Sequence, residues 1–576
     1  MSGGYGNSGM ILKVAAADNI TNAGTINVSG ASNTGMRVDY GAVNAGTAGS
    51  PTAQNNNAIN VNDNGNLGII ANGSGSTTNR ATGINGAAGI IKVLGNGSAG
   101  LFGISGGRVT NAASGQVLVS GTSSLGMVVV DSTSTGTNSG IINVTGNSSA
   151  GVYNVGTFNM NSGTITANTP SSVGVYSKPS STTSITGGTI TVSNGSTALS
   201  AENSTISMTG PVVTVNNGGL FFYKNGTGAV SGTGTVNVNN NGTAFYITGG
   251  NTPTLSTLVT SGNLTLNMAA GSTLVGWDQP VGTLSLNALT TVLGTPSIAN
   301  TTVNDLSGAT YRSFIINKAN VLVDKNVTLA GTGNQYFPRI SFVSSSVQIG
   351  NGYTVSGTGN NQIAMAQRNY TGSAGLGAII LSNNGTINLS GTDSTGIAGD
   401  FATINNTGII TTSGNRSTGI FAANGSQVTN TGTINVNTAG SNNSGVGIYG
   451  TNNFDGTAVS YGTGKVNIIN AGTIKYAGDS NSSGVGIYTD NNNLLTDSTV
   501  TLNAGSNIDM SGSNTGVGVF TDNSVINING GTINTGGTTG IYAIGGSQIN
   551  ASAGTIQIGA GGVGVYLAGN SQYNET

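Results

Sequence analysis

The residue types most able to bind a ligand are concentrated in one stretch of this 576-residue chain, between positions 251 and 372. The only tryptophan, Trp277, falls there together with arginines that neighbour tyrosines. Tryptophan, tyrosine and arginine are enriched at the centres of binding interfaces. The candidate ligand-binding residues are Trp277, Tyr311, Arg312, Tyr336, Arg339, Tyr353, Arg368 and Tyr370. The alternative is that this segment has merely diverged and that Trp277 fills a wider core.

Catalytic chemistry has few residues to use. The chain has no His and no Cys, which excludes serine-type triads, cysteine nucleophiles and histidine-based metal sites. Paired carboxylates could still cleave a polysaccharide, but Asp393 with Asp400 and Asp490 with Asp497 are isolated pairs that we expect not to recur one repeat later. A role in keeping the surface solvated explains these carboxylates better than catalysis does. The Gly-Gly-x-Gly-x-Asp calcium repeat is also absent, so we expect no enzyme, no metal and no cofactor.

A repeated cassette must position these residues. A sequence close to Asn-x-Gly-Thr-Ile, followed by Gly-Ile-Tyr, recurs about once every 23 residues, which is a spacing typical of stacked repeats. The first element occurs at 22–26, 138–142, 161–165, 406–410, 430–434, 470–474 and 529–533. The second occurs, with variation, at 126–127, 151–153, 174–176, 396–397, 419–421, 447–449, 486–488, 540–542 and 564–566.

Each repeat holds three short apolar runs that alternate with polar residues. They are rich in Val, Ile, Thr and Tyr and are interrupted by Gly, which indicates strands rather than helices. Three strands in about 23 residues form one rung of a parallel β-helix, whose strands pair with their equivalents about 4.8 Å above and below. The sequence therefore predicts an all-β, right-handed parallel β-helix, or β-solenoid. The run 362–368 alone has some helical character.

The cassette also predicts where its side chains lie. We expect Ile and Val to stack inside and the leading Asn to occupy a corner, where Asn and Gly tolerate a left-handed backbone and stacked amides can bond along the axis. In Gly-Ile-Tyr the Ile and the aromatic residue point to opposite faces. The once-per-rung aromatic residues are therefore either a stripe for stacking sugar rings or simple packing between rungs. They are Tyr153, Tyr176, Phe421, Tyr449, Tyr488, Phe520, Tyr542 and Tyr566.

The strength of the repeat divides the chain into three parts. Regular rungs are expected in 1–250 and 373–576, and irregular rungs with longer loops in 251–372, where the cassette fades. The composition argues against a disordered chain. Disordered chains combine low hydrophobicity with high net charge, whereas this chain has a mean hydropathy of +0.05 and a net charge of −2. Fifteen basic residues spread over the chain also cannot form a nucleic-acid surface.

Units such as 385–397 and 432–449, in which Gly-Thr-Ile-Asn precedes Ser-Thr-Gly-Ile or Ser-Gly-Val-Gly-Ile-Tyr, resemble the passenger repeats of type V autotransporter adhesins, especially the very large fusobacterial ones. The resemblance covers roughly 1–250 and 373–576. It implies an extracellular passenger at the surface of a Gram-negative cell, tethered by an outer-membrane barrel and acting in adhesion and virulence. No signal peptide or barrel is recognisable, so we expect an excised, monomeric part of a passenger, truncated in its last rung, that does not itself insert into a membrane.

The leading hypothesis is an adhesin that binds a glycan or protein on host cells or other bacteria. A structural stalk that spaces a distal tip from the membrane is the alternative, and a polysaccharide-cleaving enzyme is a third. An exposed patch of Arg and aromatic residues, a featureless surface and a carboxylate-lined groove would distinguish the three.

Overall fold

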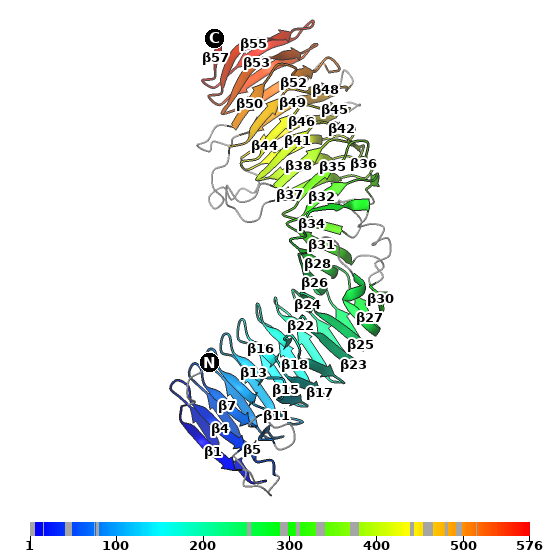
Figure 1. Ribbon diagram of the computed structural model, residues 1–576. Coiled ribbons are helices and arrows are strands. Elements are labelled where there is room, and N and C mark those ends of the chain that lie inside the picture. The colour runs from blue at the N-terminus through cyan, green and yellow to red at the C-terminus, as the bar shows by residue number, and fades with distance from the viewer. Residues whose placement is uncertain are drawn as a thin grey trace. The chain divides into compact units, whose positions relative to one another are not determined.

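The computed structural model describes residues 6–14, 17–40, 49–73, 75, 80–249, 255–287, 298–306, 311–329, 340–368, 379–437, 443–452, 465–478, 482–490, 498–513 and 515–575. Nearly all regular structure in these residues is β-strand (Figure 1). The chain forms two compact units. Unit 1 comprises Met1–Trp277 and Thr295–Phe314, and unit 2 comprises Asp278–Gly294 and Ile315–Thr576.

Unit 1 contains sheets A and B. The strands of sheet A are β1 (Ser8–Val14), β4 (Thr34–Tyr40), β7 (Leu67–Asn72), β10 (Ala99–Ile104), β13 (Leu125–Val129), β16 (Ala150–Asn154), β19 (Val173–Ser177), β22 (Thr197–Glu202), β24 (Leu220–Asn225), β26 (Thr243–Thr248) and β28 (Thr273–Asp278). The strands of sheet B are β2 (Asn19–Asn22), β3 (Thr25–Val28), β5 (Thr52–Asn55), β6 (Ala58–Val61), β8 (Thr82–Asn85), β9 (Ile90–Val93), β11 (Arg108–Asn111), β12 (Gln116–Val119), β14 (Thr135–Asn138), β15 (Ile141–Val144), β17 (Thr157–Met160), β18 (Thr164–Ala167), β20 (Thr182–Ile185), β21 (Thr189–Val192), β23 (Thr205–Val215), β25 (Ala229–Val238), β27 (Val259–Met268) and β30 (Thr301–Asp305). A 3-10 turn, η1 (Leu255–Thr257), precedes β27.

Unit 2 contains sheets C and D. The strands of sheet C are β29 (Thr283–Ser285), β32 (Asn320–Val323), β33 (Val327–Thr328), β35 (Ser346–Ile349), β36 (Thr354–Gly357), β38 (Ile379–Asn383), β39 (Thr386–Leu389), β41 (Ala402–Asn406), β42 (Ile409–Thr412), β44 (Gln427–Asn430), β45 (Thr433–Val436), β47 (Asn467–Asn470), β48 (Thr473–Tyr476), β50 (Ser498–Leu502), β51 (Asn507–Asp509), β53 (Ser524–Asn534), β55 (Gln548–Gln557) and β57 (Gln572–Glu575). The strands of sheet D are β37 (Ile363–Arg368), β40 (Thr395–Asp400), β43 (Ser417–Ala423), β46 (Ser444–Thr451), β49 (Ser483–Asp490), β52 (Val517–Asp522), β54 (Thr539–Ile544) and β56 (Val563–Leu567). Two more strands are β31 (Arg312–Asn317) and β34 (Ile340–Val343).

Each regular rung contributes one strand to sheet A or D and two to sheet B or C. All pairings between rungs in the described residues are parallel, and equivalent cassette positions face each other, as when Ala150 pairs with Val173 and Tyr153 with Tyr176. In some rungs of both units, such as β23 and β53, the two shorter strands merge into one long strand with an irregular register. The expected parallel β-helix with three short strands per rung of about 23 residues is therefore confirmed.

The two elements of the cassette contact each other across the core. Ile in the first element is fully buried, as at Ile142 and Ile474. The Gly of the second element faces it: a Cβ on Gly447 would lie 2.6 Å from Cγ2 of Ile474 and 2.4 Å from the carbonyl oxygen of Gly486. Gly126 is similarly close to Ile142 and to the backbone of Gly151. Because sheets pack closely only where no side chain intervenes, the spacing between Gly and Ile is a packing requirement.

Buried asparagine amides bond along the axis, as the cassette predicts. In unit 1 the side-chain amides of Asn22, Asn55, Asn85, Asn111 and Asn138 form an Asn ladder in which each Nδ2 donates to the Oδ1 of the next residue, at 2.7, 2.9, 2.9 and 2.9 Å. Unit 2 repeats this ladder with Asn383, Asn406, Asn430 and Asn470, at 2.8, 2.7 and 2.7 Å. The bonds satisfy buried polar groups that would otherwise cost stability.

The reason expected for Asn and Gly at the corners, a left-handed backbone, is wrong. The ladder asparagines do not have positive φ, and neither do Gly432 and Gly472. Glycine is needed there for another cause: a Cβ on Gly432 would lie 2.2 Å from the carbonyl oxygen of Gly408, and one on Gly472 equally close to that of Gly432. Left-handed backbone instead occurs at other turns, for example at Asn203 and Asn424.

Two further details differ from the sequence interpretation. Asn161, which leads its cassette, lies one residue past the ladder position, because Met160 is the residue that pairs with Asn138. The run 362–368, which has some helical character in sequence, contains strand β37 (Ile363–Arg368). Its alternation of residues matches that of the neighbouring rung, to which it pairs through Ile363 and Met365.

Candidate ligand-binding face

Two of the central residues predicted to bind a ligand are buried in the structure. Trp277 is fully buried, and its indole N–H donates to the carbonyl oxygen of Gly249 at 2.7 Å. Tyr311 is 5% exposed. Both rings therefore lie in the core of unit 1 and present no surface for a ligand, as the packing alternative for Trp277 proposes.

The remaining central candidates are partly outside the described residues. Arg312, the first residue of β31, belongs to unit 1 and is exposed, and Tyr353, in unit 2, is 37% exposed beside Gly350. Arg368 ends β37, but its side chain lies outside the described residues, as do Tyr336, Arg339 and Tyr370. Exposed candidates are thus described one in each unit, and ligand binding by the candidates outside the described residues stays a prediction.

A second set of candidates, the once-per-rung aromatic residues, does form a continuous feature. On sheet D the Ile of Gly-Ile-Tyr is buried and the aromatic residue faces outward with a partly exposed ring. The strand register places these rings one above another, as in the pairing of Tyr449 with Tyr488. The sheet D ladder consists of Phe421, Tyr449, Tyr488, Phe520, Tyr542 and Tyr566.

The rings of this ladder contact each other along its length. Centroid distances between successive rings, from Phe421 to Tyr566, are 5.3, 4.9, 4.7, 5.5 and 4.7 Å. From Tyr488 onward the rings are nearly parallel, with interplanar angles of 4°, 13° and 19°. Parallel neighbours cover each other's faces, so these four rings serve as packing between rungs. The edges of the rings remain on the outer surface.

Carboxylates flank the middle of the sheet D ladder. Asp490 and Asp522 directly follow the paired residues Thr489 and Thr521 on adjacent rungs. Burial and the nearby charge of Asp490 raise the pKa of the Asp522 carboxyl, and the same two causes, burial first, raise the pKa of the Tyr449 and Tyr488 phenols. This stretch of the face therefore has a negative potential.

The sequence interpretation did not find this carboxylate pair. It treated Asp490 as the partner of Asp497, which lies outside the described residues, and expected no carboxylate one rung later. The signal was present in the sequence: Tyr-Thr-Asp at 488–490 and Phe-Thr-Asp at 520–522 are the same motif one rung apart. The other expected pair is also divided, because Asp393 forms an ion pair with Arg416 at 2.6 Å, whereas Asp400 accepts from the Asn424 amide.

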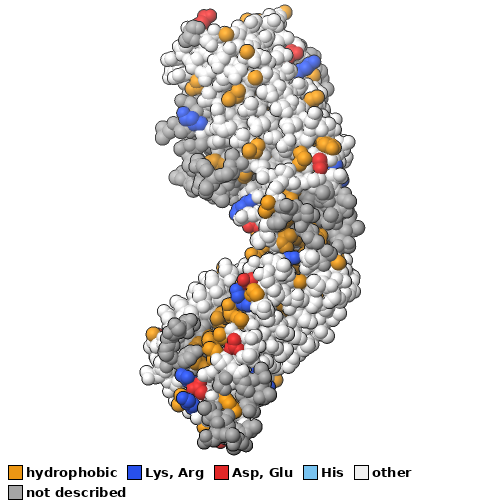
Figure 2. All heavy atoms as spheres, in the orientation of Figure 1, with side chains coloured by type: hydrophobic (Ala, Val, Ile, Leu, Met, Phe, Trp, Pro, Cys, Tyr) orange, Lys and Arg blue, Asp and Glu red, His pale blue; other side chains and the backbone are white. Residues whose placement is uncertain are grey.

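Sheet A carries the corresponding outward column in unit 1. Tyr153 and Tyr176 have centroids 5.6 Å apart, and Tyr223 and Tyr246 form a second pair at 5.9 Å. Ser200 stands between the two pairs in the register. Figure 2 shows hydrophobic side chains gathered along this face and few charged ones on the surface in view.

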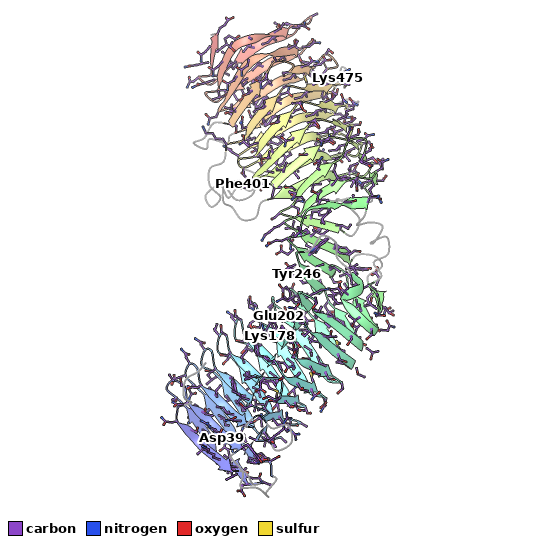
Figure 3. The ribbon with its side chains drawn as sticks, viewed as in Figure 1. Asp39, Lys178, Glu202, Tyr246, Phe401 and Lys475 are labelled. Atoms are coloured by element: carbon purple, nitrogen blue, oxygen red, sulfur yellow. The ribbon has the colours of Figure 1, made fainter. Side chains whose placement is uncertain are left out.

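An ion pair accompanies the sheet A column. Nζ of Lys178 and the phenol hydroxyl of Tyr176 both donate to Oε2 of Glu202, at 2.5 and 2.6 Å, and Figure 3 shows Lys178 and Glu202 side by side. Lys178 also lies 5.6 Å from the centroid of the Tyr176 ring. Burial, and then the hydrogen bond to Glu202, raise the pKa of Tyr176 to about 12. In sheet A, Tyr176 therefore contacts both a positive and a negative side chain.

Within the described part of the chain, no group of three or more acidic side chains is placed to hold a metal ion. Among the described residues, no helix is long and apolar enough to cross a membrane. No protein-family model matches the chain, and no curated protein matches it.

Proposed function

We propose that the chain is part of an adhesin passenger displayed at a bacterial cell surface, where it binds a glycan or protein on host cells or on other bacteria. The observation that carries the proposal is the sheet D ladder, a continuous outward column of aromatic rings on a solenoid that is rich in Asn, Ser, Thr and Gly. Aromatic rings that stay partly exposed supply contact area at low entropic cost, which is the use that binding surfaces make of them. The resemblance of the repeats to autotransporter passengers adds the location and the tether.

A structural stalk is the second candidate, and one observation favours it. The nearly parallel rings from Tyr488 to Tyr566 cover each other, so much of the sheet D ladder is accounted for by packing between rungs. A stalk needs rigidity along its axis and no ligand. The two candidates differ in whether any part of the surface retains attachment.

An attachment assay with the full chain separates these functions. The purified chain is coupled to beads and applied to host cells and to Gram-negative and Gram-positive bacteria, before and after the cells are treated with periodate or with protease. The adhesin proposal expects saturable attachment that one of the two treatments abolishes. Attachment should change little between low and high salt, because a surface with 6% charged residues has little long-range attraction to screen. Beads that attach to none of the cells would leave the stalk as the function.

A further inference from the structure

One corner of unit 2 holds an aromatic residue where the backbone favours glycine or asparagine. Phe401 is the single residue between strand β40 of sheet D and strand β41 of sheet C (Figure 3), and its φ is 53°. Among the described residues it is the only aromatic residue with positive φ. A bulky side chain in this left-handed conformation is strained.

Equivalent corners on other rungs have residues that suit this backbone. The N–H of Phe401 donates to the carbonyl oxygen of a residue one rung further along, at 3.3 Å, and the N–H groups of Asn424 and Asn523 do the same at 3.0 and 3.1 Å. The three residues therefore occupy the same place in their rungs. Both asparagines also have positive φ, 45° and 47°, which asparagine tolerates. The rung thus requires a left-handed residue at this corner, and Phe401 is the exception in type.

Phe401 also lacks the hydrogen bonds that asparagine makes at such corners. The side-chain amide of Asn424 donates to Oδ1 of Asp400 at 2.9 Å. Asn203, at the corner that follows β22, accepts from the N–H of Thr227 at 2.9 Å. A phenylalanine ring can do neither, and Phe401 is partly exposed to water. Because strain of this kind is found mainly at functional sites, the residue indicates a contact outside the fold.

The corner adjoins the beginning of the sheet D ladder. Ala398, three residues before Phe401, stands in the outward column and pairs with Phe421, the first ring of the ladder. Ala366 stands in the same column on the preceding rung. Both alanines are partly exposed. On this rung the aromatic side chain is therefore at the corner instead of in the column, and Ala366, Ala398 and Phe401 offer apolar contact alone.

Contact of this chemistry favours a protein partner over a glycan. Sugar hydroxyl groups that lost water against these three side chains would find no side-chain donor or acceptor there, which lowers affinity. An apolar pocket on a protein has no such loss. Single aromatic residues that insert into a partner's pocket also contribute a large share of the binding energy at protein interfaces.

We propose that Phe401 is a ligand-contact residue that inserts into an apolar pocket of a protein receptor. The inference rests on the proposed function, because it gives a contact residue and a ligand class to the sheet D side of the adhesin. It has a direct consequence. Replacing Phe401 by the asparagine of equivalent corners relieves the backbone and removes the contact, so stability and attachment should not fall together.

The test compares the full wild-type chain with Phe401→Asn. Denaturant unfolding followed by circular dichroism should give the variant a midpoint equal to or higher than that of the wild type. Beads coupled to the variant should attach to cells at least about tenfold less, and protease treatment of the cells, rather than periodate, should abolish attachment by the wild type. A lower midpoint, unchanged attachment, or wild-type attachment that only periodate abolishes would each overturn the proposal.

Two more variants are controls. Phe401→Tyr keeps the ring and should retain most of the attachment. Asn523→Gly changes an equivalent corner without removing a ring, tolerates the positive φ, and should attach like the wild type. Equal loss in Asn523→Gly and Phe401→Asn would show that any change at a corner disturbs the rungs, against the proposal. Wild-type beads that attach to no cell reject the proposed function as well, whereas wild-type attachment that Phe401→Asn retains rejects only the role of Phe401.

Discussion

The outward columns of sheets A and D start from the same register but differ in continuity. In sheet D six aromatic residues follow one another without a gap, whereas in sheet A Ser200 separates Tyr153 and Tyr176 from Tyr223 and Tyr246. In sheet A, Tyr176 also donates a hydrogen bond to Glu202, which forms an ion pair with Lys178. In the described part of sheet D, the carboxylate of Asp490 lies near enough to raise the pKa of the Tyr449 and Tyr488 phenols. The same rung therefore supports two surfaces, and the side chain at one position per rung decides which.

This difference separates what the fold requires from what it permits. The inward Ile, the facing Gly and the buried Asn recur in both units because neighbouring rungs impose them. The outward position accepts Ser, Ala, Val or an aromatic residue, so an unbroken aromatic column is not demanded by stacking. Four predictions use the two units as references for each other.

The largest effect is expected from the inward glycines. Gly447→Val and Gly126→Val should each destabilise the unit that contains them by about 3 kcal/mol or more, because the added carbons meet backbone oxygen and Ile Cγ2 that cannot move far. Denaturant unfolding followed by circular dichroism measures both changes. Trp277 fluorescence reports unit 1 and should respond mainly to Gly126→Val.

The control is Gly24→Ala, whose Cβ would have no atom within 4 Å. It should leave the unfolding midpoint within error. If all three variants unfold alike, the close approach of the sheets at Gly447 and Gly126 is not what holds the rungs together.

The Asn ladders should give the next largest effect. Asn430→Ala leaves the amide of Asn406 without its acceptor and Oδ1 of Asn470 without its donor, and should cost about 1 to 3 kcal/mol. Asn85→Ala should cost as much in unit 1. Asn383→Ala should cost less, because Oδ1 of Asn383 already has no hydrogen-bond partner. Equal losses in Asn430→Ala and Asn383→Ala would show that ladder position does not matter.

Continuity of the aromatic columns should have a smaller effect. Tyr488→Ala removes two ring contacts, to Tyr449 and Phe520, and should cost about 1 to 3 kcal/mol. Tyr223→Ala removes the stack with Tyr246 and should cost about half as much. Thermal or denaturant unfolding of the two variants provides the ratio, and a larger loss in Tyr223→Ala would reject the role given to continuity.

The smallest expected effect is the change of stability with pH that arises from Tyr176. The pKa of Tyr176 is raised from 10.0 to about 12 in the folded chain. Its contribution to stability is therefore complete below pH 10 and is lost as pH rises from 10 toward 12, because the unfolded chain releases the proton first. Ultraviolet titration should show this tyrosine ionising later than Tyr176 in the denatured chain, and Glu202→Gln, which removes one cause of the shift, should lower its pKa. A Tyr176 that titrates near 10 would contradict the contact with Glu202.

The architecture could be predicted from the sequence because each rung repeats the same local constraints. Alternation and Gly-Thr-Ile spacing were sufficient for strands, inward Ile and stacked Asn, whereas the outward direction of the aromatic residues followed only on condition that Ile points inward. The corner prediction failed at Gly432 because φ was inferred from residue type, whereas the cause is the carbonyl of Gly408 on the preceding rung. A contact between rungs is invisible in a single cassette.

The candidate site was harder to predict, for a different physical reason. Trp277 and Tyr311 have the composition of a binding patch but lie in the core, and composition does not report which way a ring points. The carboxylate pair Asp490 and Asp522 was missed because strand register places the two residues on adjacent rungs, 32 residues apart in the chain.

The most direct test of the account is attachment by two full-length variants with matched substitutions. One carries Tyr449→Leu, Tyr488→Leu and Tyr542→Leu in unit 2, and the other carries Tyr153→Leu, Tyr176→Leu and Tyr223→Leu in unit 1, with folding of both verified by circular dichroism. The account predicts that the unit 2 variant loses attachment to cells and that the unit 1 variant retains it. Full attachment by the unit 2 variant, or equal loss in both, would contradict the claim that the continuous ladder of sheet D is the binding face.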